Sequence, residues 1–382
     1  MKVRQVFKQL SRNLRQFKKL DYVQARNISF FDQSKSSDWK QAVSEAEKIV
    51  GYPTSFMSLR CLLSDELANV AIQIRKLVGT KHPLLKTARG FLDNGKHSLQ
   101  TRGLIVLLMA KAAGAVEGSF DQHEMVSGIY PNQRQLAEIT EMIHTAKLVH
   151  QGVINLDSLQ ETNGSYKDME FGNKIAVLSG DFLLTSASTG LAELNNTLVV
   201  EMISQAIGDM MSAEFTHLRD RNGNVLLPDT VKFSDWEHQV YLQSGSLLSK
   251  SCEAALELAG HEDNLKQAAS EFGKNVAFAR QMHEDLLPFI NKVTDVNGIL
   301  SSAPVIVHTE QYGQGSISPD FSTNQIISTV MQTGTAIDWC QQKCAEYGHN
   351  ALHSLQSFQP SDAKNALTKI IHATTNFKSL KS

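Results

Sequence analysis

Hydrophobic residues recur every three or four positions along most of this chain, which is the spacing of one face of an α-helix. The stretch from Leu136 to Leu184 shows the pattern clearly. A polar loop runs from Gln160 to Lys167, and a second apolar run opens at Phe171. We therefore expect two helices joined by this loop, the first with one face formed by Ile139, Met142, Ile143, Ala146, Val149 and His150.

The same spacing predicts one helix after another from about Asp38 to the end of the chain. The segment from Arg102 to Ala113 is apolar nearly all round, which is typical of a helix in the middle of a bundle. The alternation of apolar and polar residues that is typical of a β-strand is confined to Ala303–His308, and it is bounded by Pro304. The other helices are expected from Ser37 and Asp38 to Gly51, from Ser64, from Pro83, and at Leu198–Leu218, Trp236–Leu258, Asn264–Phe289, Asn324–Tyr347 and after Ser361.

These patterns predict an all-α protein with one large helical domain in residues 36–382, because no linker or internal repeat divides that range. Composition agrees: among 382 residues, 42% are hydrophobic and 20% are charged, enough to bury a large core. A net charge of −2 gives no reason to expect nucleic acid as a partner. Four cysteines without a Cys-x-x-Cys pair indicate reduced thiols rather than disulfides or zinc.

The first 35 residues have a different character from the rest of the chain. They are rich in lysine and arginine, contain no acidic residue before Asp21, and place Val6, Leu10, Leu14 and Phe17 on roughly one helical face. This pattern predicts a mitochondrial transit peptide and a matrix location, with a solvated basic helix as the alternative. The apolar run that begins at Leu104 is broken by Lys111, so no transmembrane segment is expected.

The stretch FGNKIAVLSGDFLL, from Phe171 to Leu184, carries a family resemblance. It is similar, almost letter for letter, to part of the first catalytic region of the trans-prenyl diphosphate synthases. These enzymes condense isopentenyl diphosphate onto an allylic diphosphate. The resemblance extends from about Asp38 to Lys378, and it implies the helical bundle of the isoprenoid synthase type.

In the family, the helix before that stretch reads H-D-D-x-x-D-x-x-x-x-R-R-G. This chain has uncharged residues at the three aspartate positions, Gln151, Gly152 and Asn155, and has Gln160 and Glu161 at the two arginine positions. Aspartates four residues apart on one helix face form one wall of a Mg²⁺ clamp. Because an amide is a poor Mg²⁺ ligand and glycine supplies none, we expect no metal at this wall.

The second wall should fall in EFGKNVAFARQMHEDLLPF, which resembles the family's G-K-N-x-G-x-A-F-Q-L-x-D-D-x-x-D. Glu284 and Asp285 stand at the first two aspartate positions, and Pro288 replaces the last. Proline in a helix interior costs roughly 3 kcal/mol, so we expect the helix to kink or end near Pro288. Glu284 and Asp285 are either a weak cation site or a solvated helix face.

The residues that hold substrate in the family are also changed. Gln243 and Ser244 stand where the family has a lysine–threonine pair, and Leu99 replaces the lysine of its G-K-x-x-R-P motif. The arginine of that motif survives as Arg102, and His144 matches the family's isopentenyl-binding histidine. The resemblance thus implies residual diphosphate contacts at Arg102 and His144, although a buried histidine can equally be a core residue.

We therefore expect no catalytic, cofactor-binding or metal-binding residues on this chain. The resemblance implies a non-catalytic subunit of a polyprenyl diphosphate synthase, in a heterotetramer whose Mg²⁺-binding catalytic partner makes the isoprenoid tail of ubiquinone. The alternatives are an enzyme of weak or altered activity that binds a prenyl diphosphate, and a lipid-binding module on the same fold.

Overall fold

The computed structural model describes residues 37–51, 80, 82–85, 101–116, 125–158, 165–215, 231–291, 299–313, 315–318 and 321–377. Within these ranges the chain forms helices and turns, and its strand pairing is limited to one isolated bridge between Val126 and Ile129. The all-α prediction is confirmed. The predicted transit peptide, the helix expected from Ser64, and Leu99, Gln160 and Glu161 lie outside the described residues.

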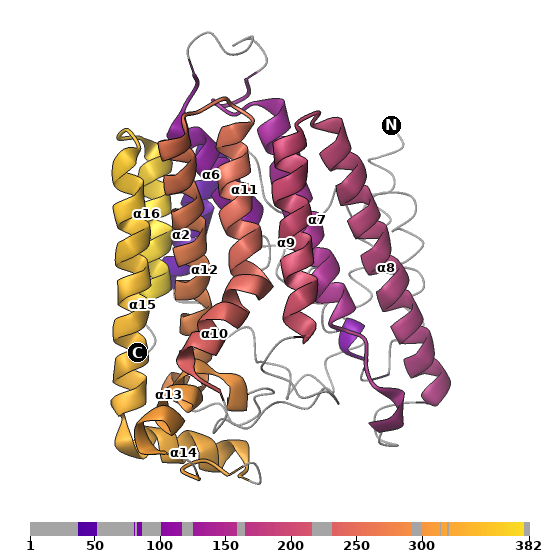
Figure 1. Ribbon diagram of the computed structural model, residues 1–382, viewed down its shortest axis with the longest axis vertical. Helices are drawn as coiled ribbons and strands as arrows, with labels where there is room; N and C mark the ends of the chain where they lie inside the picture. The colour runs from indigo at the N-terminus through magenta and orange to yellow at the C-terminus, as the bar shows by residue number, and fades with distance from the viewer. Residues whose placement is uncertain are drawn as a thin grey trace.

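The long helices stand side by side, with α15, α2 and α16 at one edge and α8 at the other (Figure 1). Helices α13 and α14 lie together at one end of the bundle (Figure 1). The bounds are α2 Ser37–Val50, α6 Thr101–Ala113, α7 Pro131–His150, α8 Tyr166–Glu193, α9 Thr197–Ser212, α10 Phe233–Val240, α11 Ser246–Glu257, α12 Asp263–Asn291, α13 Ala303–Tyr312, α14 Thr323–Thr333, α15 Thr335–Ser354 and α16 Asp362–Thr375.

Helix α6 lies in the centre of the bundle, as its uniformly apolar sequence predicted. Every residue from Leu104 to Ala110 is at most 2% exposed. The helix packs against α7, α11, α16 and α2, so each of its faces meets another helix. Arg102 and Gly103 are thereby placed at the buried start of α6, where the candidate site lies.

Two predicted helix ends are confirmed by their capping. Helix α2 starts at Ser37 and is followed by Gly51, whose φ of 64° is the left-handed conformation that glycine adopts readily after a helix. Ser361 precedes α16, and its hydroxyl accepts a hydrogen bond of 3.2 Å from the backbone N–H of Lys364.

Two predicted helices differ from the structure. The helix expected at Asn324–Tyr347 is divided into α14 and α15, because Gly334 adopts a φ of 70° between them. The helix expected at Trp236–Leu258 contains a π-helical turn, η8 Tyr241–Gly245, between α10 and α11. The run Ala303–His308 is helical rather than strand-like, since Pro304 lies in the first turn of α13, where its missing N–H costs nothing.

Helix α8 packs chiefly on α7 and forms an edge of the bundle (Figure 1). Among the described residues, it is the one helix whose length and apolar composition would allow it to cross a membrane, with a mean hydropathy of 1.3 over an 18-residue window. That window is 44% buried inside the protein. Core helices of soluble proteins also meet this criterion, so the finding is weak evidence for a membrane span.

Candidate functional site

The segment that should carry the first aspartate-rich motif is not helical. Helix α7 ends at His150, and the backbone N–H groups of Gln151, Gly152 and Val153 turn back to carbonyls of the last helical turn. Asn155 follows in an exposed loop before the short 3-10 helix η4 Leu156–Ser158. Gln151 and Asn155 therefore do not share a helix face.

The second motif lies on α12, and its two acidic residues have different surroundings. Asp285 is partly buried and accepts three hydrogen bonds of 2.8 Å, from Trp236 Nε1, the backbone N–H of Ala303 and Gln281 Nε2. Burial raises the pKa of Asp285 to about 6, against the effect of these donors. Asp285 thus joins α12 to α10 and to the start of α13.

Glu284 points to solvent, as expected for a solvated helix face. Its side chain is 52% exposed and pairs with Arg280 one turn earlier, with 3.3 Å between Oε1 and Nε. Helix α12 continues past Pro288 and ends at Asn291, so it ends within one turn of Pro288, near the position expected. Pro288 lies in the last turn, where it removes one backbone hydrogen bond and little of the helix remains to be disrupted.

Arg102 and His144 are brought together as expected. The guanidinium of Arg102 donates through Nη1 to Nε2 of His144 at 2.8 Å. Burial, with Arg102, Lys147 and Arg280 nearby, holds the pKa of His144 well below its usual value, so the imidazole is neutral and accepts this bond. Burial and the charge of Arg280 lower the pKa of Arg102 to about 10, which leaves it charged at neutral pH.

Two further charged residues lie on α7, and the sequence analysis missed both. Glu141 is 1% exposed and accepts a hydrogen bond of 2.8 Å from the backbone N–H of Gly103; burial raises its pKa to about 7. Lys147 donates from Nζ to the carbonyl of Gln243 at 2.6 Å, and burial lowers its pKa to about 8. Both residues are three positions from His144, so helical spacing was the signal that could have found them.

The π-helical turn η8 holds the positions of the family's lysine–threonine pair. Gln243 contributes its carbonyl to Lys147, and Ser244 donates its hydroxyl to the carbonyl of Val240 at 3.2 Å. The lysine that family members carry at position 243 is thus absent, and a lysine from α7 reaches the same turn instead. Sequence periodicity does not distinguish a π-turn from an α-helix, so this contact could not be foreseen.

The described residues do not fit a Mg²⁺ clamp. No group of three or more histidine, cysteine, aspartate or glutamate side chains suited to a metal ion occurs among them. Both oxygens of Asp285 already accept hydrogen bonds from N–H donors, and Gln151 and Asn155 are exposed amides. The charges around Arg102 and His144 are of both signs, because Lys147 and Arg280 lie near them together with the carboxylates of Glu141, Glu214 and Glu284.

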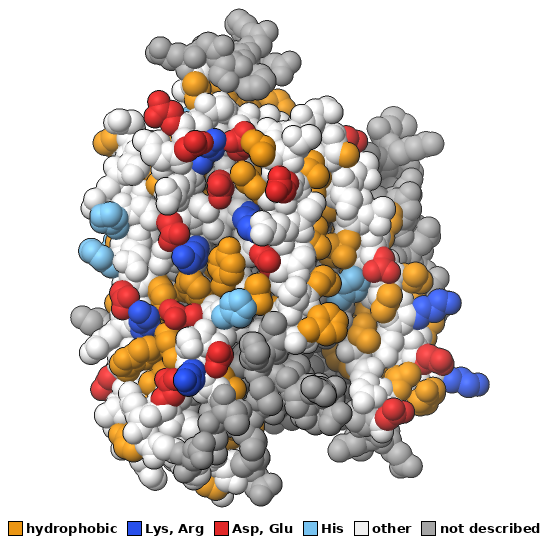
Figure 2. Space-filling model, viewed as in Figure 1, with side chains coloured by type: hydrophobic (Ala, Val, Ile, Leu, Met, Phe, Trp, Pro, Cys, Tyr) orange, Lys and Arg blue, Asp and Glu red, His pale blue; other side chains and the backbone are white. Residues whose placement is uncertain are grey.

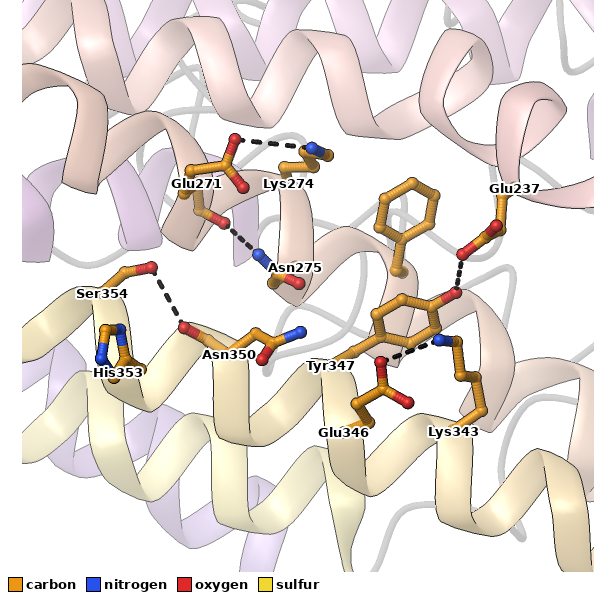
Figure 3. A pocket seen from close by; sticks show the side chains of 11 residues that line it. Glu237, Glu271, Lys274, Asn275, Lys343, Glu346, Tyr347, Asn350, His353 and Ser354 are labelled. Atoms are coloured by element: carbon orange, nitrogen blue, oxygen red, sulfur yellow. Dashed lines mark hydrogen bonds and ion pairs between the residues drawn. The ribbon is translucent and has the colours of Figure 1, made fainter. Parts of the chain in front are cut away.

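A separate groove of about 470 Å³ lies between α12 and α15 (Figure 3). Its charged side chains pair with one another: Lys274 with Glu271 at 3.4 Å, and Lys343 with Glu346 at 2.8 Å. The hydroxyl of Tyr347 donates to Glu237 at 2.5 Å. These charged groups are thus paired with one another.

The fold and the matched motifs define a protein of the isoprenoid synthase class. Residues 84–308 match the family model described as polyprenyl synthetase. The decaprenyl diphosphate synthase of Rhodobacter capsulatus has the same fold, with a TM-score of 0.62, 17% identity, and coverage of 88% of this chain and 97% of that chain.

Curated relatives are more similar in sequence. The chain is 48% identical over 352 residues to the all trans-polyprenyl-diphosphate synthase PDSS2 of Rattus norvegicus, covering 89% of this chain and 88% of the relative. It is 31% identical to the probable mitochondrial hexaprenyl pyrophosphate synthase of Yarrowia lipolytica, covering 72% and 74%. The chain belongs to the polyprenyl synthetase family.

Proposed function

We propose that this protein is a non-catalytic subunit of a polyprenyl diphosphate synthase. It pairs with a catalytic chain in a heterotetramer of the mitochondrial matrix, and the complex makes the isoprenoid tail of ubiquinone. The observation that carries this proposal is the end of α7 at His150, because the wall needed for Mg²⁺ lacks both carboxylates and a helix to present them. The related chains named as mitochondrial synthases support the location.

The exposed face of α8 supports a role in subunit contact. Val177 and Leu178 are 42% and 53% exposed, and Asp181 is the single charged residue between Ile175 and Ala192. Leu198 on α9 is also 51% exposed, and hydrophobic side chains are visible on the α9 and α8 side of the molecule (Figure 2). Exposed aliphatic side chains on an edge helix suit a subunit contact, and a permanent interface generally buries more than about 2,000 Å².

Co-purification with a catalytic polyprenyl diphosphate synthase chain tests the proposal. We expect the two chains, co-expressed with one tag, to elute as a mixed complex, and we expect this chain alone to self-associate. The variant Val177→Asp/Leu178→Asp should lose the partner, whereas Met331→Asp on α14, which is also partly exposed, should keep it. If this chain alone is a stable monomer at micromolar concentration and does not bind the catalytic chain, the proposal is contradicted.

One observation favours a second function, the binding of a prenyl diphosphate without turnover. Arg102 and Lys147 are largely withdrawn from solvent, and the carboxylates that act on them, Glu141 and Glu284 on Arg102 and Glu214 on Lys147, form no direct ion pair with them among the described residues. Buried cations normally have an anionic partner, and a diphosphate would provide one. Calorimetric titration with inorganic diphosphate in EDTA should then show binding that Arg102→Met weakens at least tenfold. Equal binding by both proteins, or none by the wild type, would exclude this function.

A further inference from the structure

Arg280 gives α12 a positive charge that the family sequence does not have at this position. Ala279 and Gln281 match the residues on either side of a phenylalanine in the family's G-K-N-x-G-x-A-F-Q-L-x-D-D-x-x-D, and Arg280 takes the place of that phenylalanine. Its side chain is 24% exposed, so the guanidinium group is largely withdrawn from water. A charge withdrawn from water costs free energy unless other groups compensate it, so Arg280 needs partners.

The guanidinium group of Arg280 reaches the start of α6, beside Arg102. Its Nη1 donates a hydrogen bond to the hydroxyl of Thr101, which is the first residue of α6 and is 2% exposed. On another side, Cζ of Arg280 lies 5.7 Å from the centroid of the Trp39 ring on α2. Arg280 therefore lies among α12, α6 and α2, against the residue that precedes Arg102 in the sequence.

Arg102 and Arg280 are close enough to repel one another. Burial is the main cause of the lowered pKa of Arg102, and the charge of Arg280 is the next. This repulsion has a larger effect on the Arg102 pKa than the attraction of either Glu141 or Glu284 taken singly. Two like charges that are withdrawn from water in this way favour an anion that contacts both.

The imidazole of His144 lies in the same electrostatic field. Apart from burial, the groups that lower its pKa are all cations, namely Arg102, Lys147 and Arg280. At neutral pH the carboxyl of Glu141, with a pKa of about 7, is ionised only in part. Glu141 therefore offsets only part of the positive charge at the start of α6.

Glu284 is the carboxylate that pairs directly with Arg280. Its Oε1 lies 3.3 Å from Nε of Arg280, and its side chain is 52% exposed. An ion pair this exposed is weak, because water screens the attraction between the two groups. A ligand that carries more negative charge than one carboxylate can therefore displace Glu284 from Arg280.

We propose that Arg102 and Arg280 together bind one diphosphate group, without a metal ion. This inference rests on the second function proposed above and deepens it, because it adds a residue of α12 to the binding site. An arginine side chain donates two parallel hydrogen bonds to phosphate oxygens, so two arginines can hold one diphosphate from two helices. The helix that binds metal through carboxylates in the family thus binds the anion directly in this chain.

Calorimetric titration of the full chain with inorganic diphosphate in EDTA tests the role of Arg280. Arg280→Met should weaken binding about tenfold or more, since it removes a charge-assisted hydrogen bond. Arg280→Lys should fall between this variant and the wild type, because it keeps the charge and loses the paired donors. Lys343→Met is the matched control and should leave binding unchanged, since Lys343 is 23% exposed and pairs with a glutamate three residues away.

Glu284→Gln should change binding in the opposite direction. It removes the competing carboxylate, so diphosphate binding should tighten about two- to fivefold, the range that an exposed ion pair is worth. A purely structural role of Arg280 predicts unchanged or weaker binding in this variant. Because Glu284 is exposed, its replacement tests the proposal even if Arg280→Met does not fold.

The outcomes separate this inference from the function on which it rests. If Arg102→Met weakens binding and Arg280→Met does not, or if Glu284→Gln fails to tighten it, the inference is overturned and the diphosphate site at Arg102 remains. If the wild type binds no diphosphate, both are overturned. The subunit role stands in either case, because co-purification with the catalytic chain tests it separately.

Discussion

The carboxylate of Asp285 accepts a hydrogen bond of 2.8 Å from the indole nitrogen of Trp236. The same oxygen accepts the backbone N–H of Ala303 at the start of α13, where a helix favours negative charge. An acidic residue at a position that binds metal in active relatives is thus retained here as a structural contact among three helices.

Replacing Asp285 should cost stability. Asp285→Ala leaves the N–H groups of Trp236 and Ala303 without an acceptor, so we expect the free energy of unfolding to fall by about 2–4 kcal/mol. Asp285→Asn keeps one oxygen and should cost less, and Glu284→Ala, on the exposed side, should stay within about 0.5 kcal/mol of the wild type. Chemical denaturation followed by tryptophan fluorescence measures all three. An unchanged stability in Asp285→Ala would show that the contact is unimportant.

Glu141 should make stability depend on pH. Its folded-state pKa of about 7 lies above the ordinary value of 4.5. The shift therefore adds to the free energy of unfolding in full below pH 4.5, and this added stability is lost as pH rises through 7. Glu141→Gln keeps an acceptor for Gly103 and does not titrate. Relative to this variant, the wild type should lose about 3 kcal/mol between pH 4.5 and pH 7. Denaturation curves at several pH values measure this. If the difference in free energy of unfolding between the two proteins is the same at every pH, the pKa shift is refuted.

Restoring the three aspartates should not restore catalysis. The variant Gln151→Asp/Gly152→Asp/Asn155→Asp lacks a lysine at position 243 and free carboxylates on α12, and each missing charge contact typically costs about 3 kcal/mol in barrier height. Gly152→Asp should also destabilise the chain, because its side chain meets the backbone of Leu84. If this variant catalyses Mg²⁺-dependent condensation and the wild type does not, the protein is a weakened enzyme instead.

The amino terminus should be processed on import. We expect the mature protein to begin between about Arg26 and Asp38, just before or at the start of α2. Amino-terminal sequencing of the protein from isolated mitochondria measures this directly. An intact Met1 on the mitochondrial protein would contradict the transit-peptide prediction.

Local patterns predicted much of the fold. Apolar spacing located α6 and α12 to within a few residues, and Ser361 marked the start of α16, whereas α9 ends at Ser212, before the expected Leu218. Gly334 was visible in the sequence, but a single glycine inside an apolar pattern does not reveal whether its φ is positive. The division between α14 and α15 therefore had to come from the structure.

The candidate site was less predictable because its contacts are long-range. His82 and Asn173 are 91 residues apart, and no local pattern links them. Asp285 could have been separated from Glu284, since it falls at helical spacing with the buried Phe278, Met282 and Phe289. The first motif was judged by its missing charges, whereas the end of α7 at His150 and the hydrogen bonds between Asn173 and Ile154 were found only in the structure.

The most direct test of the subunit role is the incorporation of labelled isopentenyl diphosphate by the purified chain alone, with an allylic diphosphate primer and Mg²⁺. The account predicts no product above that of an enzyme-free control, and long-chain product once the catalytic partner is added. Mg²⁺-dependent product from the single chain, abolished by Asp285→Asn, would contradict it.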